Sequence, residues 1–212
     1  MTRPLRRRVL VVLAGVLLLG AAGYLARHAV LRGLGAALIA PDRVGSAEIA
    51  VMTTEVQLDG ELELADLWAA HVVPEVGVLL PDRTRAEREM AARGVVLDDA
   101  PARLTRLGVP AAAIVTIDAN EGGTVDATAA LAAWCRTHRI HTLLVVTSVS
   151  HSRRVERSLA RDFGRDGPTV LVHVPRLDGF RADTWWQHRG TLRVGLVELE
   201  KLALDYLRHP LG

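Results

Sequence analysis

The sequence has only one cysteine, Cys135, so no disulfide can form within the chain. Cys135 lies beside Trp134 in a segment with helical spacing, which favours a buried structural thiol over a nucleophile. Aromatic residues make up only 4% of the chain, and after residue 32 there are 20 basic against 24 acidic residues, a formal net charge of −4. A weakly acidic region with few aromatics argues against nucleic-acid binding.

Acidic residues are absent from the first 32 positions, and residues 9–26 carry no charge at all. These eighteen residues include ten Val or Leu, which predicts a transmembrane helix near the lower length limit of about 17–25 residues. Arg6, Arg7 and Arg8 precede this segment, whereas Arg27 and Arg32 follow it. The larger number of arginines on the N-terminal side predicts a single-pass cell-membrane protein, with the N-terminus cytoplasmic and the C-terminal domain outside.

A cleaved signal peptide is the alternative to an anchor, because Gly20-Ala21-Ala22 resembles a cleavage site. We favour the anchor, since those small residues fall inside the apolar run. The expected organisation is a cytoplasmic basic tail (1–8), a transmembrane anchor (9–26), a membrane-proximal linker or short helix (27–45) and a single α/β domain (46–212).

Segments of strand and helix character alternate through the domain. Strands are predicted at 47–52, 76–80, 112–117, 143–146 and 169–174, and helices at 61–73, 84–94, 101–107, 125–138, from about 152 and at 191–207. The alternation predicts an α/β fold: a Rossmann-like, doubly wound, mostly parallel five-stranded sheet with helices on both faces, preceded by one transmembrane helix.

Polar side chains follow the strands, and right-handed crossovers place these strand exits at one edge of the sheet. The stretch after the fourth strand contains Thr147, Ser148, His151 and Arg154 at a helix start, where free backbone N–H groups favour an anion. The other candidate site residues are Thr124 and Asp126 at the next helix start upstream, Glu55 after the first strand and Asp82 after the second. A pocket exists only if the loops at 121–126 and 147–154 meet.

His151 is the candidate catalytic residue, as a general base kept neutral by the helix start; a histidine that merely caps its helix is the alternative. Arg154 has the geometry to hold a phosphate or carboxylate, or else is a solvated helix arginine. Thr124, Asp126 and Ser148 can also contact a ligand, but a capping or turn role is the interpretation we favour for each of them. The acidic residues show no metal-ligand spacing, so the sequence assigns no metal site, and it does not identify a cofactor.

The motif Thr147-Ser148-x-x-His151-x-x-Arg154 after a strand resembles the signature of the SanA/ElyC/YdcF-like family of bacterial envelope-associated domains. Gly123-Thr124-Val125-Asp126 is similar to the family's Asn-Thr-x-Glu, and Gly108-Val109-Pro110 to its Gly-Val-Pro. The resemblance implies a role in cell-envelope maintenance, in peptidoglycan or lipid-carrier metabolism, and a phosphate-bearing ligand.

The chain departs from the family pattern in two loops that carry glycines there: it has Thr53-Thr54-Glu55 after the first strand and Leu80-Pro81-Asp82 after the second. Three hypotheses therefore stay open: an anchored enzyme acting on a lipid-linked phosphate, a non-catalytic module that binds an anionic ligand, and a structural partner of envelope-synthesis proteins with a degenerate site. Trp185 and Trp186 are predicted to pack over the sheet edge, with a lid or membrane contact as the alternative.

Overall fold

A computed structural model describes residues 3–95, 98–119 and 123–210. Its core is a five-stranded sheet of β1 (Ile49–Met52), β2 (Glu75–Pro81), β3 (Ile114–Ala119), β4 (Thr142–Val146) and β5 (Thr169–His173). All four strand pairings are parallel and the strand order is β3-β2-β1-β4-β5. The predicted α/β class and doubly wound parallel sheet are confirmed, and the strands lie within about two residues of the expected ranges.

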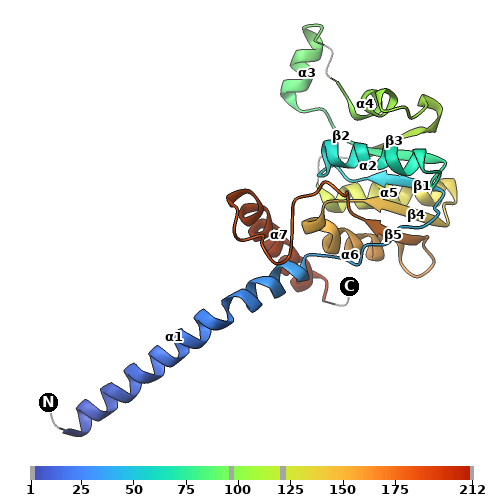
Figure 1. Ribbon diagram of the computed structural model, residues 1–212. Coiled ribbons are helices and arrows are strands. Elements are labelled where there is room, and N and C mark those ends of the chain that lie inside the picture. The colour runs from blue at the N-terminus through green and yellow to red at the C-terminus, as the bar shows by residue number, and fades with distance from the viewer. Residues whose placement is uncertain (1–2, 96–97, 120–122, 211–212) are drawn as a thin grey trace.

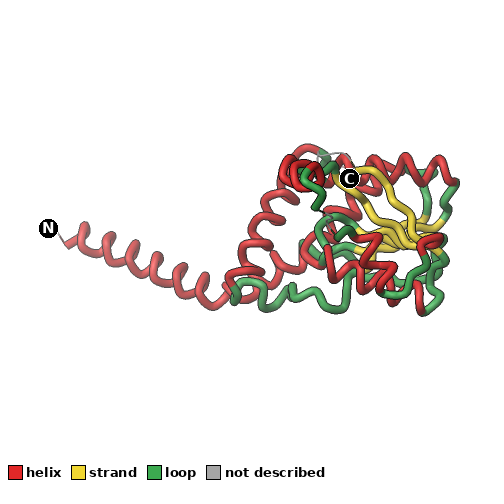
Figure 2. Tube along the Cα trace, turned by 90° about the horizontal axis from the view of Figure 1, so that it is seen from above, coloured by secondary structure: helices red, strands yellow, loops and turns green. Residues whose placement is uncertain are grey.

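Helices cover both faces of the sheet because the central strands are apolar on both sides. Ala50 and Met52 of β1 face α2 (Gln57–Ala69) and α4 (Ala100–Arg106), whereas Ile49 and Val51 face α5 (Thr124–His138) and α6 (Ser152–Phe163). The same alternation in β4 buries every residue from Leu143 to Val146. Figure 2 shows the twisted sheet between these two layers.

The short helix α3 (Arg85–Ala92) projects away from the sheet and buries none of its side chains (Figure 1). It begins at the predicted capping box: the Thr84 hydroxyl accepts from the Glu87 backbone N–H, and the Glu87 carboxylate accepts from the Thr84 N–H. The capping hydrogen bonds therefore stabilise α3, which gains little from packing against the sheet.

The N-terminal helix α1 (Arg3–Ala37) is longer than the predicted anchor and includes a 27-residue span, Val11–Ala37, that is long and apolar enough to cross a membrane. Residues 27–37, expected in a linker or a short helix, continue the same helix. No proline lies between Pro4, in the first turn of this helix, and Pro41, and Gly35, Leu38 and Ala40 are buried against the domain.

Trp185 joins α1 to the C-terminal helix α7 (Arg189–Arg208). Its side chain is 1% exposed, and its indole N–H donates to the Leu31 carbonyl at 2.8 Å. Gly35 of α1 and Gly195 of α7 lie against the ring, so close that a Cβ at either position would fall 2.7 or 2.4 Å from ring atoms. Two glycines thus allow both helices to pack on one tryptophan. Trp185 is therefore buried, but it packs between α1 and α7 and not over the sheet edge as expected.

Candidate functional site

The candidate site lies where the strand order reverses, between β1 and β4. Crossovers from β1 and from β4 run to opposite sides of this point, which leaves a crevice at the carboxyl ends of the strands. Hydrogen bonds join the chain after β1 to the chain at the end of β4. The Thr53 backbone N–H donates to the Val146 carbonyl at 2.9 Å, and the Thr53 hydroxyl donates to the Thr147 hydroxyl at 3.1 Å. Thr147 is fully buried and joins the two loops.

His151 follows β4 at the end of a 3₁₀ turn, Val149–His151, and its side chain is 2% exposed. Its Nδ1 lies 2.9 Å from Oε2 of Glu198. On the opposite side of the ring, Nε2 lies 3.3 Å from Oε1 of Glu55 and 3.4 Å from the Thr124 hydroxyl. The loop after β1, the start of α5, the turn after β4 and α7 therefore converge on one imidazole.

Glu198 is the site residue that sequence reasoning missed. The Arg154 guanidinium binds both of its carboxylate oxygens, at 3.0 and 3.3 Å, and the Lys201 ammonium lies 3.0 Å away. One signal in the sequence pointed to it: Glu198 shares a helix face with Gly195 and Leu202, and a carboxylate on a buried helix face needs a charged partner.

The carboxylates on either side of the ring stabilise the charged form of His151. Burial alone would lower the pKa of His151, but hydrogen bonds to Glu198 and Glu55 outweigh burial and raise it. Burial would likewise raise the pKa of Glu55 and of Glu198, yet the hydrogen bond and charge of His151 lower each to about 2. This direction of the pKa favours a charged His151 over the neutral base that the sequence analysis expects, against the opposing charge of the Arg154 guanidinium, whose Nη2 lies 2.8 Å from Nδ1.

A cavity of about 470 Å³ opens beside this cluster. Its walls come from Glu55 and Asp59 on the β1 side, Ser148 and His151 on the β4 side, and Asp178 with the following residues. The first turns of α7 complete it through Gly190, Thr191, Val194 and Glu198. The first turn of α7 contains no acidic residue, and the side chain of the N-cap residue His188 accepts no hydrogen bond from the helix. The backbone N–H groups at the start of α7, beside the cavity, are therefore not capped by these side chains.

Two of the predicted anion-binding groups are instead occupied by the protein's own carboxylates. The backbone N–H of Val149, at the start of the turn after β4, donates to Asp178 at 2.9 Å, and Arg154 is paired with Glu198. Arg154 therefore positions Glu198, which in turn positions His151. Asp178 also accepts a hydrogen bond from the Phe180 backbone N–H at 2.8 Å.

The structure brings together most of the predicted site residues but not all of them. Ser148 and Glu55 line the cavity, and Thr124 contacts both Glu55 and His151. Asp126 is exposed on the first turn of α5 and Asp82 is exposed after β2, and neither lines the cavity. Of the predicted loop at 121–126, residues 121 and 122 lie outside the described part of the chain, and the remainder meets the loop at 147–154 as expected.

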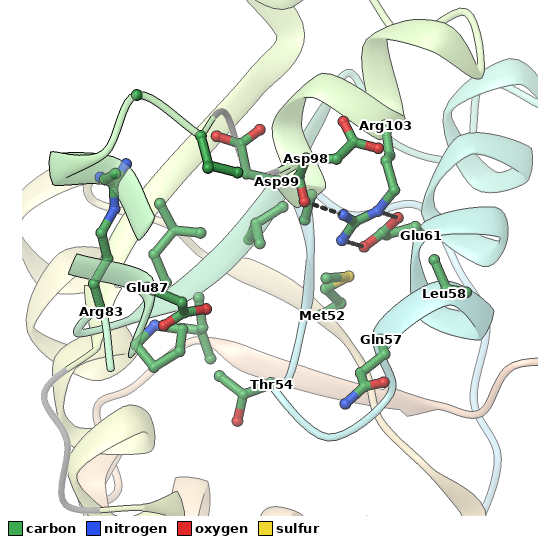
Figure 3. Close-up of a pocket in the computed structure, with 18 residues that line it drawn as sticks. Met52, Thr54, Gln57, Leu58, Glu61, Arg83, Glu87, Asp98, Asp99 and Arg103 are labelled. Carbon is green, nitrogen blue, oxygen red and sulfur yellow. Dashed lines mark hydrogen bonds and ion pairs between the residues drawn. The ribbon is translucent and has the colours of Figure 1, made fainter. Parts of the chain in front are cut away.

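A larger cavity of about 890 Å³ lies at the exits of β1 and β2, under α3 and α4 (Figure 3). Its most buried charged group is Glu61, 2% exposed, whose carboxylate accepts two hydrogen bonds from Arg103, at 2.6 and 2.7 Å. That pair is satisfied internally, and the cavity wall contains no histidine among the described residues. Of these two cavities, only the smaller one has a histidine, His151, in its wall, and it is therefore the candidate site.

Neither a metal centre nor a reactive thiol is found in the described residues. No group of three His, Cys, Asp or Glu side chains in them has the arrangement to hold a metal ion. Burial raises the pKa of the Cys135 thiol to about 12, and Cys135 packs in the core between the sheet and α5, away from the cavity. The groups that the site itself offers for chemistry are the histidine, the hydroxyls and the carboxylates around the ring.

Comparison with known proteins returns no match to this chain, either among protein-family models or among curated proteins.

Proposed function

We propose that this chain is a membrane-anchored, extracytoplasmic protein of the SanA/ElyC/YdcF-like type that binds and processes a phosphate-bearing ligand of the cell envelope. A lipid-carrier phosphate or pyrophosphate is the ligand class we favour. Three features support this: the apolar span Val11–Ala37, the Thr147-to-Arg154 motif, and the cavity at the point where the strand order reverses.

The observation that carries the proposal is the orientation of His151. Glu198 contacts its Nδ1, and Nε2 lies on the other side of the ring, next to Thr124 and to Glu55, which lines the cavity. A charged imidazole in this position serves as a general acid. In hydrolysis of a pyrophosphate, water would bond to the terminal phosphorus as the bridging P–O bond breaks, and His151 would protonate the leaving oxygen. The proton lost by water would pass to solvent.

The start of α7 supports placement of the phosphate. Gly190 and Thr191 bring the positive end of a 20-residue helix to the cavity wall, and the charge of His151 adds to it. Glu55 and Glu198 are each paired with a cation, so they repel an incoming phosphate less than free carboxylates would.

A second candidate function, non-catalytic binding or scaffolding with a degenerate site, is favoured by one observation. Arg154 and the Val149 N–H, the groups expected to hold an anion, already bind Glu198 and Asp178. A partner among envelope-synthesis proteins would then recognise the fold without any turnover.

Farnesyl diphosphate, a soluble prenyl diphosphate, separates the candidates when the full chain is assayed in detergent micelles. For an enzyme, His151→Gln lowers phosphate release about 100-fold or more while the Kd for the probe stays within about tenfold. The matched control is Asp126→Asn, an exposed carboxylate outside the cavity, which leaves both values unchanged.

Binding without release of phosphate would establish the non-catalytic module in place of the enzyme. Absence of binding to farnesyl diphosphate, pyrophosphate and inorganic phosphate would overturn the phosphate-ligand proposal.

A further inference from the structure

The C-terminal helix α7 exposes an apolar face that packs on nothing in the described structure. Leu196, Val197, Ala203, Leu204 and Leu207 form this surface, which we call the α7 outer face. Leu196 is 54% and Leu207 79% exposed, although both are large and apolar. Helical spacing places them opposite Gly195, Glu198 and Leu202, the residues that α7 buries against the domain. The outer face therefore points directly away from the protein core.

Basic residues predominate around this surface. Arg189, Arg193, Lys201 and Arg208 are exposed on α7, and the exposed acid Glu200 lies within the outer face itself, one turn from Leu196 and from Leu204. An apolar face flanked by arginines is typical of helices that lie in the interface of a membrane, where the arginines meet anionic headgroups. A surface made for a second copy of the chain would need no such excess of one charge.

The position of α7 relative to α1 fits a membrane surface. In two perpendicular views α7 lies on the side of the sheet from which α1 leaves, and it runs across the axis of α1 (Figures 1 and 2). Trp185 bonds to the Leu31 carbonyl, and the Trp186 ring lies 5.9 Å from that of His28. With a rise of about 1.5 Å per residue, the domain begins within one or two turns of residue 26, the last of the uncharged segment.

We propose that the α7 outer face lies on the surface of the bilayer that α1 enters, an anionic surface that its arginines recognise. The inference rests on the proposed anchoring of the chain and deepens the proposed function. The opposite flank of the same helix forms the cavity wall beside His151 through Thr191, Val194 and Glu198. The cavity then opens at the level of the headgroups, and its ligand is an amphiphile whose polar head is presented there while its apolar part stays in the bilayer.

Spin labels on the full chain in nanodiscs of phosphatidylethanolamine and phosphatidylglycerol test this geometry. Single cysteines replace Leu196, Leu207, Val16 of α1 or the exposed Thr137 of α5, each in a Cys135→Ala background. The readout is the accessibility of each label to oxygen, which is lipid-soluble, relative to a water-soluble nickel complex. We expect the labels at 196 and 207 to favour oxygen, as the label at 16 does, and the label at 137 to favour nickel.

The outcomes separate this inference from the proposal on which it rests. A label at 207 as accessible to nickel as the one at 137, with the label at 16 still in lipid, overturns the docking and leaves the anchor intact. Loss of lipid contact at 16 overturns the anchor itself. Spin–spin broadening between labels at 207 would show a second copy on this face and would also overturn the inference.

The arginines supply an independent arm of the test. Arg189→Gln and Arg193→Gln each lower the ratio of docked to undocked chains about fivefold in the anionic nanodiscs. In nanodiscs of phosphatidylcholine alone the same substitutions have no effect. An equal effect in both lipids would contradict recognition of an anionic surface.

Discussion

His151 is held between two acidic side chains that come from opposite ends of the domain. Glu55 reaches its Nε2 from the loop after β1, and Glu198 reaches its Nδ1 from α7. Arg154 and Lys201 compensate Glu198 in turn, so the ring takes part in a network of alternating charges. In such a network, removal of one member leaves its neighbour charged and unpaired.

Glu198→Gln should lower the free energy of unfolding by about 3 kcal/mol, since it leaves the Arg154 guanidinium, 11% exposed, without its carboxylate partner. Chemical denaturation of the full chain in detergent micelles measures the change. Glu200→Gln on the exposed side of the same helix is the control and should change stability by less than about 0.5 kcal/mol. Equal effects of the two substitutions would contradict the network.

The network also predicts how stability depends on pH. The pKa of His151 is raised above 6.5 by folding, so its contribution is complete below pH 6.5 and is lost as the pH rises through the higher value. The pKa values of Glu55 and Glu198 fall from 4.5 to about 2, so their contributions are complete above pH 4.5 and are lost as the pH falls toward 2.

We therefore expect the difference in Tm between the wild-type protein and His151→Gln to be largest between pH 4.5 and 6.5 and to shrink at higher pH. Melting curves from pH 5 to 9 measure it, with the exposed His188→Gln as control. A difference that grows as the pH rises above 6.5 would mean that the folded protein holds a neutral imidazole.

The sequence was sufficient to locate His151 but not to assign its charge. The motif from Thr147 to Arg154 follows a strand and marks a strand exit without any knowledge of the rest of the chain. The charge depends on Glu198, which is 47 residues away in the sequence. A local pattern contains no information about such a contact. Because the pairing of Arg154 with Glu198 could not be foreseen either, Arg154 was expected to bind a ligand.

At the scale of the elements, α1 and α7 are joined through one side chain. Trp185 fills the space between them only because Gly35 and Gly195 leave room for its ring. An added methyl group there meets a buried aromatic ring with no free volume around it, and such overpacking costs about 1–3 kcal/mol.

Gly35→Ala should therefore destabilise the domain by about 1–3 kcal/mol and increase the solvent exposure of Trp185. Tryptophan fluorescence and chemical denaturation measure these two changes. Gly33→Ala is a close control on the same helix, since nothing lies within 4 Å of its added Cβ, and it should be neutral or stabilising by up to about 1 kcal/mol. The packing at Trp185 would be refuted by equal effects at the two glycines.

The elements themselves were largely predictable, because apolar alternation and turn residues are local signals. The end of α1 was not. Its last apolar residues resemble a linker in the sequence, and only the packing of Leu38 and Trp185 keeps them helical and in contact with the domain. The missed buried face of α7 has the same cause, since its partner residues lie far away in the chain.

For the molecule as a whole, the arginines around α1 predict its orientation in a membrane. Three arginines directly precede the apolar segment, against two that follow it. A C-terminal alkaline phosphatase fusion, active only outside the cytoplasm, should therefore be active, and a C-terminal green fluorescent protein fusion should be dark. Replacement of Arg6, Arg7 and Arg8 by Asn should lower the phosphatase activity and raise the fluorescence.

The strand order was not fixed by the sequence pattern, which predicted parallel strands with helices on both sides but not which strands are neighbours. The order matters because it places β1 beside β4, and hence Glu55 beside His151. Long-range pairing of this kind arises from the packing of the whole sheet and has no short motif that reports it.

The central claim, that His151 is a charged general acid at the cavity, is tested most directly by a titration of its imidazole ring. Nuclear magnetic resonance of the full chain in micelles, with isotope-labelled histidine and assignment by His151→Gln, reports the pKa of this one ring. We predict a pKa above 6.5 that falls in the Glu198→Gln variant. A pKa at or below 6.5 in the wild-type protein, or one unchanged by Glu198→Gln, would contradict the claim.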